Sequence, residues 1–155
     1  MVRKLKDKFV YIAGPLFSQA EREFNKKLKG KLSEFADIYL PQEDGKLLSE
    51  MIKSGIKVDT ARKLVFREDI GAISRCDLFI IIMDGRVVDE GAAFELGYAY
   101  SKRKTCIGLK TDTRREIEGI DNPMVEEGCD VILYSIEDLA RKVEEILFTK
   151  TLKMV

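Results

Sequence analysis

The chain has 155 residues, of which 45% are hydrophobic and 35% are charged, and its 27 Lys and Arg residues balance 27 Asp and Glu residues. This length predicts a single domain over residues 1–155, and the apolar fraction excludes a disordered chain. The zero net charge provides no basic excess for a nucleic-acid polymer, and no apolar run approaches the roughly 20 residues of a membrane span, so we expect neither partner.

Strands and helices alternate in the first half of the chain. Phe9–Ala13 is a short apolar run that ends at Gly14-Pro15, which predicts a buried strand followed by a turn. Ser18 is a candidate N-cap for a helix that runs to about Phe35. Ile38–Leu40 predicts a second strand, and residues 42–60 give mixed signals that allow a short helix.

The same alternation continues to the end of the chain. Ala61–Ser74 has helical spacing, and Asp77–Met83 is a continuous apolar run, typical of a central parallel strand covered on both faces. After the loop Asp84–Glu90, the remaining predicted elements are a helix at Gly91–Lys102, strands at Thr105–Leu109 and Asp130–Tyr134, and a helix from Ile136 to about Phe148. This order predicts an α/β fold with a doubly wound, five-stranded parallel sheet in a three-layer sandwich. Ligands of such sheets bind beyond the carboxyl ends of the strands.

The reactive side chains narrow the possible chemistry. The sequence contains no histidine, which excludes imidazole bases and imidazole metal ligands. Its cysteines, Cys76, Cys106 and Cys129, include no close pair, so they fit neither a disulfide framework nor a zinc site and indicate reduced thiols in a cytoplasmic protein. Catalysis would have to use carboxylates, Tyr, Lys, Ser, Thr or Cys. The high charge also resembles that of heat-adapted proteins.

Acidic residues gather after the third predicted strand, at Asp84, Asp89, Glu90 and Glu95. Glu95 lies in the first turns of a helix, where the helix dipole and free N–H groups favour an ionised carboxylate. Such a carboxylate could attack a sugar carbon. Small neighbours, Gly91, Ala92, Ala93 and Gly97, would leave open space around it. The alternative is that acidic residues simply favour helix N-termini.

Two further residues have both a structural and a functional interpretation. Asp69 lies on the helix before the third strand and faces either the strand ends or solvent. Tyr11 lies near the end of the first strand and is either part of the core or a hydroxyl that reaches the site. The turn at Gly14-Pro15 matches neither a P-loop nor a G-x-G-x-x-G motif, so no dinucleotide or nucleoside triphosphate is predicted.

Four segments, taken together, resemble a known family. They are Tyr11–Phe17 (YIAGPLF), Asp69-Ile70, Asp89 followed six residues later by Glu95–Ala99 (ELGYA), and Asn122-Pro123-Met124. Their order and spacing resemble the nucleoside 2-deoxyribosyltransferase family. The resemblance implies a flavodoxin-like sheet and transfer of 2-deoxyribose between nucleobases through a covalent sugar–enzyme intermediate, with no metal and no organic cofactor.

The resemblance also implies roles for individual residues. Glu95 is the nucleophile, Tyr11 orients it, and Asp69, or Asp89 in its place, protonates the departing base. The implied substrate-binding residues are Gly14, Phe17, Gln42 (or Glu43 in a neighbouring register), Asp89, Gly91, Asn122 and Met124. Asn122 would be donated by a neighbouring subunit, so a homo-oligomer with shared active sites is implied, and its small-molecule partners would be a deoxynucleoside and a nucleobase.

Two other functions remain open at this point. A related 2′-deoxynucleoside 5′-phosphate N-hydrolase would use the same glutamate and release the sugar phosphate to water. Arg86 and Arg114 are the cations that could meet such a phosphate. A non-catalytic nucleotide-binding module is also compatible with the fold, because the fold alone does not determine function.

Overall fold

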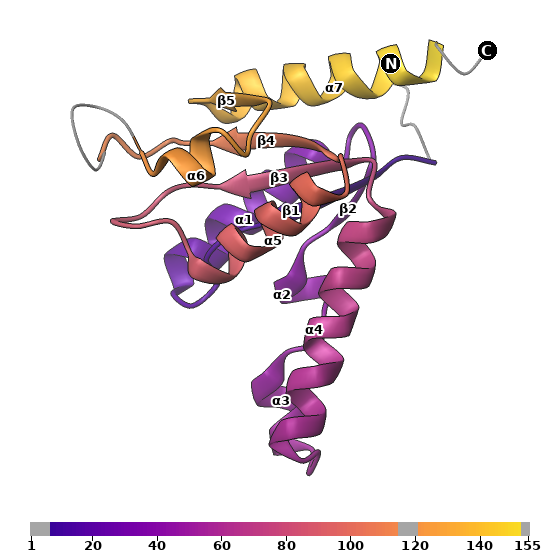
Figure 1. The fold of residues 1–155 in the computed structure, drawn as a ribbon, viewed down its shortest axis with the longest axis vertical. Coiled ribbons are helices and arrows are strands. Elements are labelled where there is room, and N and C mark those ends of the chain that lie inside the picture. The colour runs from indigo at the N-terminus through magenta and orange to yellow at the C-terminus, as the bar shows by residue number, and fades with distance from the viewer. Residues whose placement is uncertain (1–6, 115–120, 153–155) are drawn as a thin grey trace.

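The computed structural model describes residues 7–114 and 121–152 and shows one sheet with helices on both faces (Figure 1). The strands are β1 (Phe9–Ala13), β2 (Asp37–Tyr39), β3 (Leu78–Ile82), β4 (Thr105–Leu109) and β5 (Val131–Leu133). They pair in the order β2-β1-β3-β4-β5, and every pair is parallel. This is the flavodoxin-like strand order, so the predicted doubly wound α/β sheet is confirmed.

The helices follow the predicted alternation with small shifts at their ends. They are α1 (Gln19–Leu32), α2 (Pro41–Asp44), α3 (Leu48–Lys53), α4 (Val58–Arg75), α5 (Glu90–Ser101), α6 (Pro123–Glu126) and α7 (Ile136–Leu152). Residues 42–60, for which the sequence allowed one short helix, contribute to two short helices and to the start of α4. The sequence did not predict α6, because one helical turn is too short to show a hydrophobic period. Across the described ranges, no helix combines the length and the apolar character needed to cross a membrane.

Alternating strand residues divide the interior into two layers. Val10 and Ile12 of β1 point into the layer that α1 and α7 cover. Tyr11 and Ala13 point into the opposite layer, which α4 and α5 cover. This alternation is the two-residue period of a strand. The residues predicted to be catalytic on β1, α4 and α5 therefore meet in the second layer.

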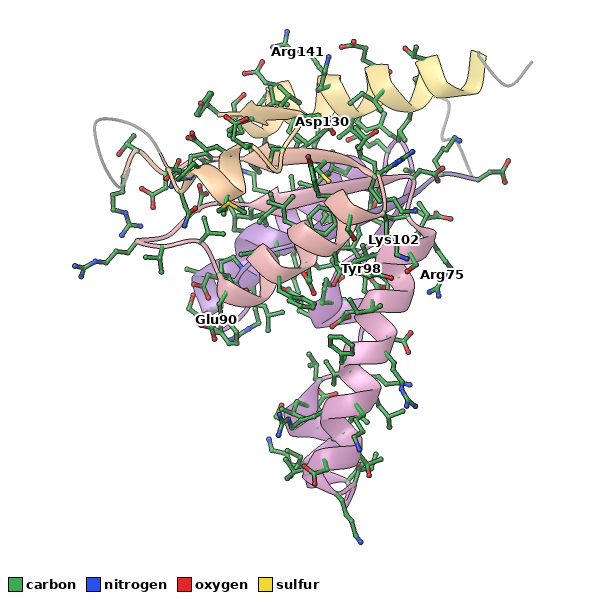
Figure 2. The ribbon with its side chains drawn as sticks, viewed as in Figure 1. Arg75, Glu90, Tyr98, Lys102, Asp130 and Arg141 are labelled. Carbon is green, nitrogen blue, oxygen red and sulfur yellow. The ribbon has the colours of Figure 1, made fainter. Side chains whose placement is uncertain are left out.

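Helix α4 extends beyond the sheet (Figure 1). Its 18 residues span about 27 Å, and only its C-terminal part, with Ala72 and Ile73, packs into the core. The N-terminal part of α4 and helix α3 extend away from the sheet as an arm (Figure 1). Figure 2 shows Tyr98 and Lys102, near the C-terminal end of α5, beside the end of α4 that carries Arg75. Asp69 consequently lies where α4 leaves the core.

The turn between β1 and α1 is held by two local features. A capping box joins Ser18 and Glu21, because the Ser18 side chain accepts from the Glu21 backbone while the Glu21 side chain accepts from the Ser18 backbone. The predicted N-cap is therefore confirmed. Gly14 packs directly on β3, since a Cβ atom there would lie 2.9 Å from the Cβ atom of Ile82. The absence of a side chain at Gly14 is thus a packing requirement.

We expect Gly14→Ala to destabilise the protein by roughly 1–3 kcal/mol, because the added methyl group overpacks a buried strand. Gly30→Ala is the matched control, because Gly30 lies in α1 with nothing within 4 Å of its Cβ position. That change should stabilise the protein by about 1 kcal/mol through helix propensity. Urea unfolding of both variants measures the two values, and equal midpoints would contradict the packing argument.

Candidate active site

Glu95 and Tyr11 meet at the edge of the sheet. Glu95 lies in the second turn of α5 and is partly buried. The Tyr11 hydroxyl donates a hydrogen bond of 2.8 Å to the Glu95 Oε1 atom, and the Tyr11 side chain is fully buried. Since β1 and α5 are held together by the core, this hydroxyl fixes the orientation of the carboxylate. Both interpretations of Tyr11 from the sequence therefore apply, because its ring belongs to the core and its hydroxyl reaches Glu95.

The rings of three strands form a row beneath these carboxylates. Tyr11 of β1 is the register partner of Tyr39 on β2 and of Phe79 on β3. Its ring stacks on both, with centroid distances of 5.2 Å to Tyr39 and 5.6 Å to Phe79. All three side chains are buried. The row therefore gives the tyrosine hydroxyls fixed positions under α4 and α5.

Asp69 lies on α4 beside this row. Its Oδ1 atom accepts a hydrogen bond of 3.3 Å from the Tyr39 hydroxyl. The sequence left open whether Asp69 faces the strand ends or solvent, and the structure places it, partly buried, in the wall of the same cavity as Glu95. Two carboxyl groups thus share one site, and each accepts from one tyrosine.

Burial dominates the electrostatics of both acids. The pKa of Glu95 is raised to about 8, chiefly by burial, with smaller contributions from Asp69 and Asp89 and against the opposing Tyr11 hydrogen bond. Burial also raises the pKa of Asp69 to about 6, with a smaller contribution from Glu68 and an opposing hydrogen bond from Tyr39. The expectation of a Glu95 kept ionised by the helix N-terminus is therefore wrong. The reason is that α5 begins at Glu90, which leaves Glu95 beyond the free N–H groups of the first turn.

A cavity of about 810 Å³ opens in front of the two acids, within the roughly 300–1,000 Å³ of small-molecule sites. Its walls come from α3, α4 and α5, namely Leu48, Asp59, Arg62, Lys63, Val65, Phe66, Asp69, Ile70, Gly91, Phe94 and Glu95. Phe66 and Phe94 touch, with ring centroids 6.0 Å apart, and both are more than half exposed. A largely apolar surface with Glu95 and Asp69 in its wall suits a flat aromatic ligand that carries a polar reacting group.

The other predicted residues on α5 and in the loop after β1 divide between this cavity and a separate hollow. Gly91 lines it directly, whereas Ala92 is buried in the core, so only part of the expected open space exists. Asp89 is the N-cap of α5 and accepts from the Ala92 backbone at 2.8 Å. Asp89 and the exposed Phe17 line a separate hollow of about 320 Å³. This hollow lies between the loop after β1 and the loop after β3.

Gln42 is engaged in a structural contact. Its Oε1 atom accepts from the Asn25 side chain at 2.9 Å, and its Nε2 atom donates to the Arg22 carbonyl at 3.0 Å. Both partners belong to α1, so the Gln42 amide ties α2 to α1. Gln42 is not among the residues that line the cavity of Glu95, and its assignment to substrate stays a prediction.

Asn122 and Met124 lie on a different side of α5. Asn122 is the N-cap of α6 and accepts from the Met124 backbone at 2.9 Å. It lines a hollow of about 240 Å³ with Ala93 of α5, two positions before Glu95. Residues two apart on a helix point in nearly opposite directions. Within one chain, Asn122 is therefore separated from the Glu95 cavity by α5, and Met124 is exposed.

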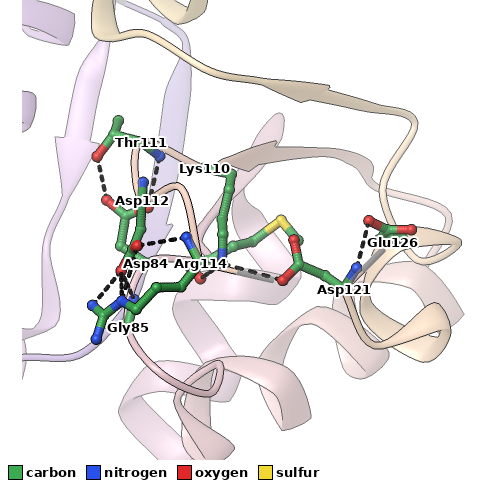
Figure 3. Close-up of polar contacts among 9 residues, drawn as sticks. Asp84, Gly85, Lys110, Thr111, Asp112, Arg114, Asp121 and Glu126 are labelled. Carbon is green, nitrogen blue, oxygen red and sulfur yellow. Dashed lines mark hydrogen bonds and ion pairs between the residues drawn. The ribbon is translucent and has the colours of Figure 1, made fainter. Parts of the chain in front are cut away.

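Sequence reasoning missed two polar contacts that shape this region. One is the Tyr39–Asp69 hydrogen bond. The other is a buried ion pair in which the Lys110 ammonium lies 3.2 Å from Asp121 and also donates to the Met83 carbonyl (Figure 3). Lys110 directly follows the buried strand β4, and a lysine at a strand end is the one available signal. The sequence pattern gave no indication that Asp121 is the partner of Lys110.

The acidic residues outside the cavity have structural roles or face solvent. Asp84 accepts from the backbone N–H groups of Thr111 and Asp112, at 2.6 and 2.8 Å, and so holds the loop after β4 (Figure 3). Glu90 is exposed at the start of α5 (Figure 2). Among the residues described, no group of three or more Cys, Asp or Glu side chains could hold a metal ion.

The sequence model of one family, nucleoside 2-deoxyribosyltransferase, matches residues 10–131. No curated protein matches. The resemblance seen in the sequence is thereby confirmed at the level of the family, because the matched residues include most of the chain.

Solved structures share the fold along almost the whole chain. A conserved protein from Enterococcus faecalis V583 is 25% identical with a TM-score of 0.69, over 89% of this chain and 98% of that chain. A 2-deoxyribosyltransferase from Bacillus psychrosaccharolyticus is 22% identical with a TM-score of 0.71, over 85% and 90%. A CMP N-glycosidase from Clostridium botulinum is 22% identical with a TM-score of 0.52, over 88% and 99%. At these identities the likeness describes the fold.

The raised pKa of Glu95 predicts a pH-dependent cost in stability. Below pH 4.5, the ordinary pKa of a glutamate, Glu95 is protonated in the folded and unfolded states alike and costs nothing. Between pH 4.5 and about 8 the unfolded chain releases the proton and the folded one retains it, so stability falls as pH rises. The variant Glu95→Gln does not titrate and so avoids this loss. Between pH 4.5 and about 8, its free energy of unfolding should therefore rise relative to that of the wild type by at most about 1.4 kcal/mol per pH unit.

Urea unfolding at pH 5 and pH 8 measures this gain. Glu90→Gln is the control, because Glu90 is an exposed glutamate of the same helix. Its stability difference from the wild type should be the same at both pH values. If Glu95→Gln also shows a constant difference, burial of Glu95 does not raise its pKa in solution.

Proposed function

This chain belongs to the nucleoside 2-deoxyribosyltransferase family, and we propose that it transfers 2-deoxyribose between nucleobases through a covalent intermediate on Glu95. The observation that carries the proposal is the pairing of two acids in one cavity wall, with Glu95 held by Tyr11 at 2.8 Å and Asp69 beside it. A nucleophilic carboxylate and a carboxylic acid are the two groups that glycosyl transfer with retention requires.

In the first half of the reaction, Glu95 attacks the anomeric carbon C1′ of a 2′-deoxynucleoside. The bond from C1′ to the base nitrogen breaks, a bond from C1′ to a Glu95 oxygen forms, and the proton of Asp69 passes to the departing base. In the second half, a nitrogen of the incoming base attacks C1′, the bond from C1′ to the Glu95 oxygen breaks and frees the carboxylate, and the proton of that nitrogen passes to Asp69. Because a 2′-deoxy sugar reaches an oxocarbenium-like transition state easily, one carboxylate nucleophile is sufficient.

The pair of acids supplies one proton at neutral pH. With a pKa of about 8 for Glu95 and about 6 for Asp69, the pair binds one proton between these values. The reaction needs that proton on Asp69 and the negative charge on Glu95. The two pKa values place that proton on Glu95, so the reacting form is the minor arrangement of the singly protonated pair; the Tyr11 hydrogen bond, which lowers the pKa of Glu95, narrows the gap between the two arrangements. Activity therefore requires a pH between the two values.

The apolar walls favour transfer over hydrolysis. Phe66 and Phe94 offer exposed rings on which an aromatic base can stack. A base bound there after the first half displaces water from the acids and keeps the acceptor close to C1′. Transfer to a base then competes well with attack by water.

The hydrolase alternative has weaker support. It requires cations for a 5′-phosphate, and of the two candidates Arg114 is engaged by Asp112. Arg86 lines the hollow beside Phe17 and Asp89. Comparing a deoxynucleoside with its 5′-monophosphate as substrate decides between the two activities, because the hydrolase requires the phosphate.

We also propose that the active unit is a homo-oligomer in which Asn122 reaches the site of a second copy. This is supported by the separation of Asn122 from Glu95 by α5 within one chain and by the exposure of Met124 next to it. Asn122 and Asp89 would then hold the sugar hydroxyls, while Gly91 leaves room for the substrate and Gly14 and Phe17 would contact it.

Incubation with deoxyinosine and adenine should give deoxyadenosine and hypoxanthine. Glu95→Ala should lose at least about a hundredfold in rate, because it removes the nucleophile. Glu90→Ala, on the exposed start of the same helix, should retain full activity. Product analysis by chromatography measures both, and robust exchange by Glu95→Ala would exclude it as the nucleophile.

Mixing two inactive variants tests the shared site. In a dimer whose sites combine Glu95 of one copy with Asn122 of the other, unfolding and refolding an equal mixture of Glu95→Ala and Asn122→Ala rebuilds one intact site in every mixed dimer. Random pairing should restore about a quarter of the wild-type activity. No recovery after subunit exchange, verified by mass spectrometry of the mixed species, would place Asn122 in the site of its own chain.

A further inference from the structure

We propose that Tyr39 is a positioning residue for the acid of the reaction: its hydroxyl holds Asp69 and stabilises the carboxylate that Asp69 becomes when it protonates the departing base. This inference rests on the proposed function. The sequence patterns and the family resemblance did not single out Tyr39. The position of the Tyr39 hydroxyl beside Asp69 is what indicates this role.

The register of the sheet makes Tyr39 the counterpart of Tyr11. The two residues are direct partners on β2 and β1, and their rings stack at 5.2 Å with an interplanar angle of 16°. Phe79 continues the row on β3 but carries no hydroxyl. In this row, Tyr11 donates to Glu95 and Tyr39 donates to Asp69. Each hydroxyl serves one of the two acids.

The chain packs closely around the Tyr39 hydroxyl. A Cβ atom at Gly45 would lie 3.1 Å from it and 2.7 Å from the Pro41 carbonyl, so the missing side chain lets the loop after α2 approach the hydroxyl. Tyr39 is only 7% exposed. Burial and the neighbouring Asp69 raise the pKa of Tyr39, which keeps the hydroxyl protonated. It can therefore serve Asp69 as a donor at every working pH.

The charged groups around Asp69 make this donor important. Glu68 lies next to it on α4, Glu95 faces it from α5, and Tyr11 and Tyr39 face it from the strands. Glu68 is paired with Lys46 at 3.3 Å, and the cations of the cavity wall are Arg62 and Lys63, one to two turns away along α4. Burial and Glu68 oppose ionisation of Asp69, and the Tyr39 hydrogen bond favours it.

The proton balance shows where Tyr39 acts. In the neutral carboxyl, Asp69 carries the proton that the base nitrogen will receive. As the C1′–N bond breaks, this proton moves to the base and Asp69 becomes an anion in a partly buried site. Hydrogen bonds to an anion are stronger than those to the neutral acid. The Tyr39 hydroxyl keeps its own proton and therefore stabilises the product of proton transfer more than the reactant.

The experiment compares two leaving groups in the variant Tyr39→Phe, which retains the stacked ring. With deoxyinosine, kcat should fall about 10- to 100-fold, the effect of losing a hydrogen bond to a charged group. With 7-methyl-2′-deoxyguanosine, whose base leaves without needing a proton, kcat should be unchanged. Tyr98→Phe is the matched control, because the Tyr98 hydroxyl bonds Ser74 at 2.8 Å outside the cavity, and it should affect neither substrate.

A second measurement does not depend on turnover. Carbon-13 NMR titration of the aspartate carboxyl groups, with Asp69 assigned through Asp69→Asn, should show a higher Asp69 pKa in Tyr39→Phe than in the wild type. The limb of the pH–rate profile near pH 6 should shift to higher pH together with the Asp69 pKa. Tyr98→Phe should leave both unchanged.

The outcomes separate the two proposals. Equal losses of kcat with both substrates, or an unchanged Asp69 pKa in a wild-type enzyme that transfers deoxyribose, would overturn the role of Tyr39 alone. No turnover of any deoxynucleoside by the wild type would overturn the proposed function and, with it, the role of Tyr39 in the reaction. A selective loss with deoxyinosine together with a raised Asp69 pKa supports both.

Discussion

The parallel register of three strands is the constraint on which the rest of the site depends. It aligns Tyr39, Tyr11 and Phe79 on one face of the sheet, where their rings stack. Stacked aromatic pairs contribute about 0.5–1.5 kcal/mol beyond the burial of their surface. A shift of one residue in either strand would turn the tyrosine toward the other layer. The positions of the two hydroxyls are therefore as rigid as the sheet itself.

The two helices over this face complete the site. Helix α5 carries Glu95 and helix α4 carries Asp69, and both helices contribute to the same core layer as the tyrosines. Each acid pairs with a hydroxyl that a different strand positions. Because the rings are buried and the acids lie only partly in the core, the carboxyl groups remain open to the cavity while their orientation is fixed from below.

Burial provides the acid–base chemistry that a chain without histidine otherwise lacks. Removing carboxylates from water and placing them near one another raises their pKa into the neutral range, to about 8 for Glu95 and about 6 for Asp69. Raised pKa values lower the stability of the folded chain at every pH above the ordinary pKa of glutamate and aspartate. The same shift gives the pair one exchangeable proton at neutral pH, which is what an acid and a nucleophile acting together require.

The sequence by itself determined the order of the strands and the longer helices, the parallel sheet and the residue types of the site. Continuous apolar runs such as that ending at Met83, the cap at Ser18 and the ELGYA segment with Glu95 were sufficient, because local periodicity, capping and motif spacing are properties of neighbouring residues. Glu95, Asp69 and Tyr11 were all identified this way, and the structure brings them together.

Only the tertiary structure decided how these residues act on one another. The Tyr39–Asp69 hydrogen bond joins residues 30 positions apart, and the buried Lys110–Asp121 pair joins residues 11 positions apart between β4 and α6; no local pattern encodes either contact. The protonation of Glu95 was also mispredicted from the sequence, since the helix dipole is a local effect and burial is not. Desolvation depends on every element packed around a group, and that packing exists only in the folded chain.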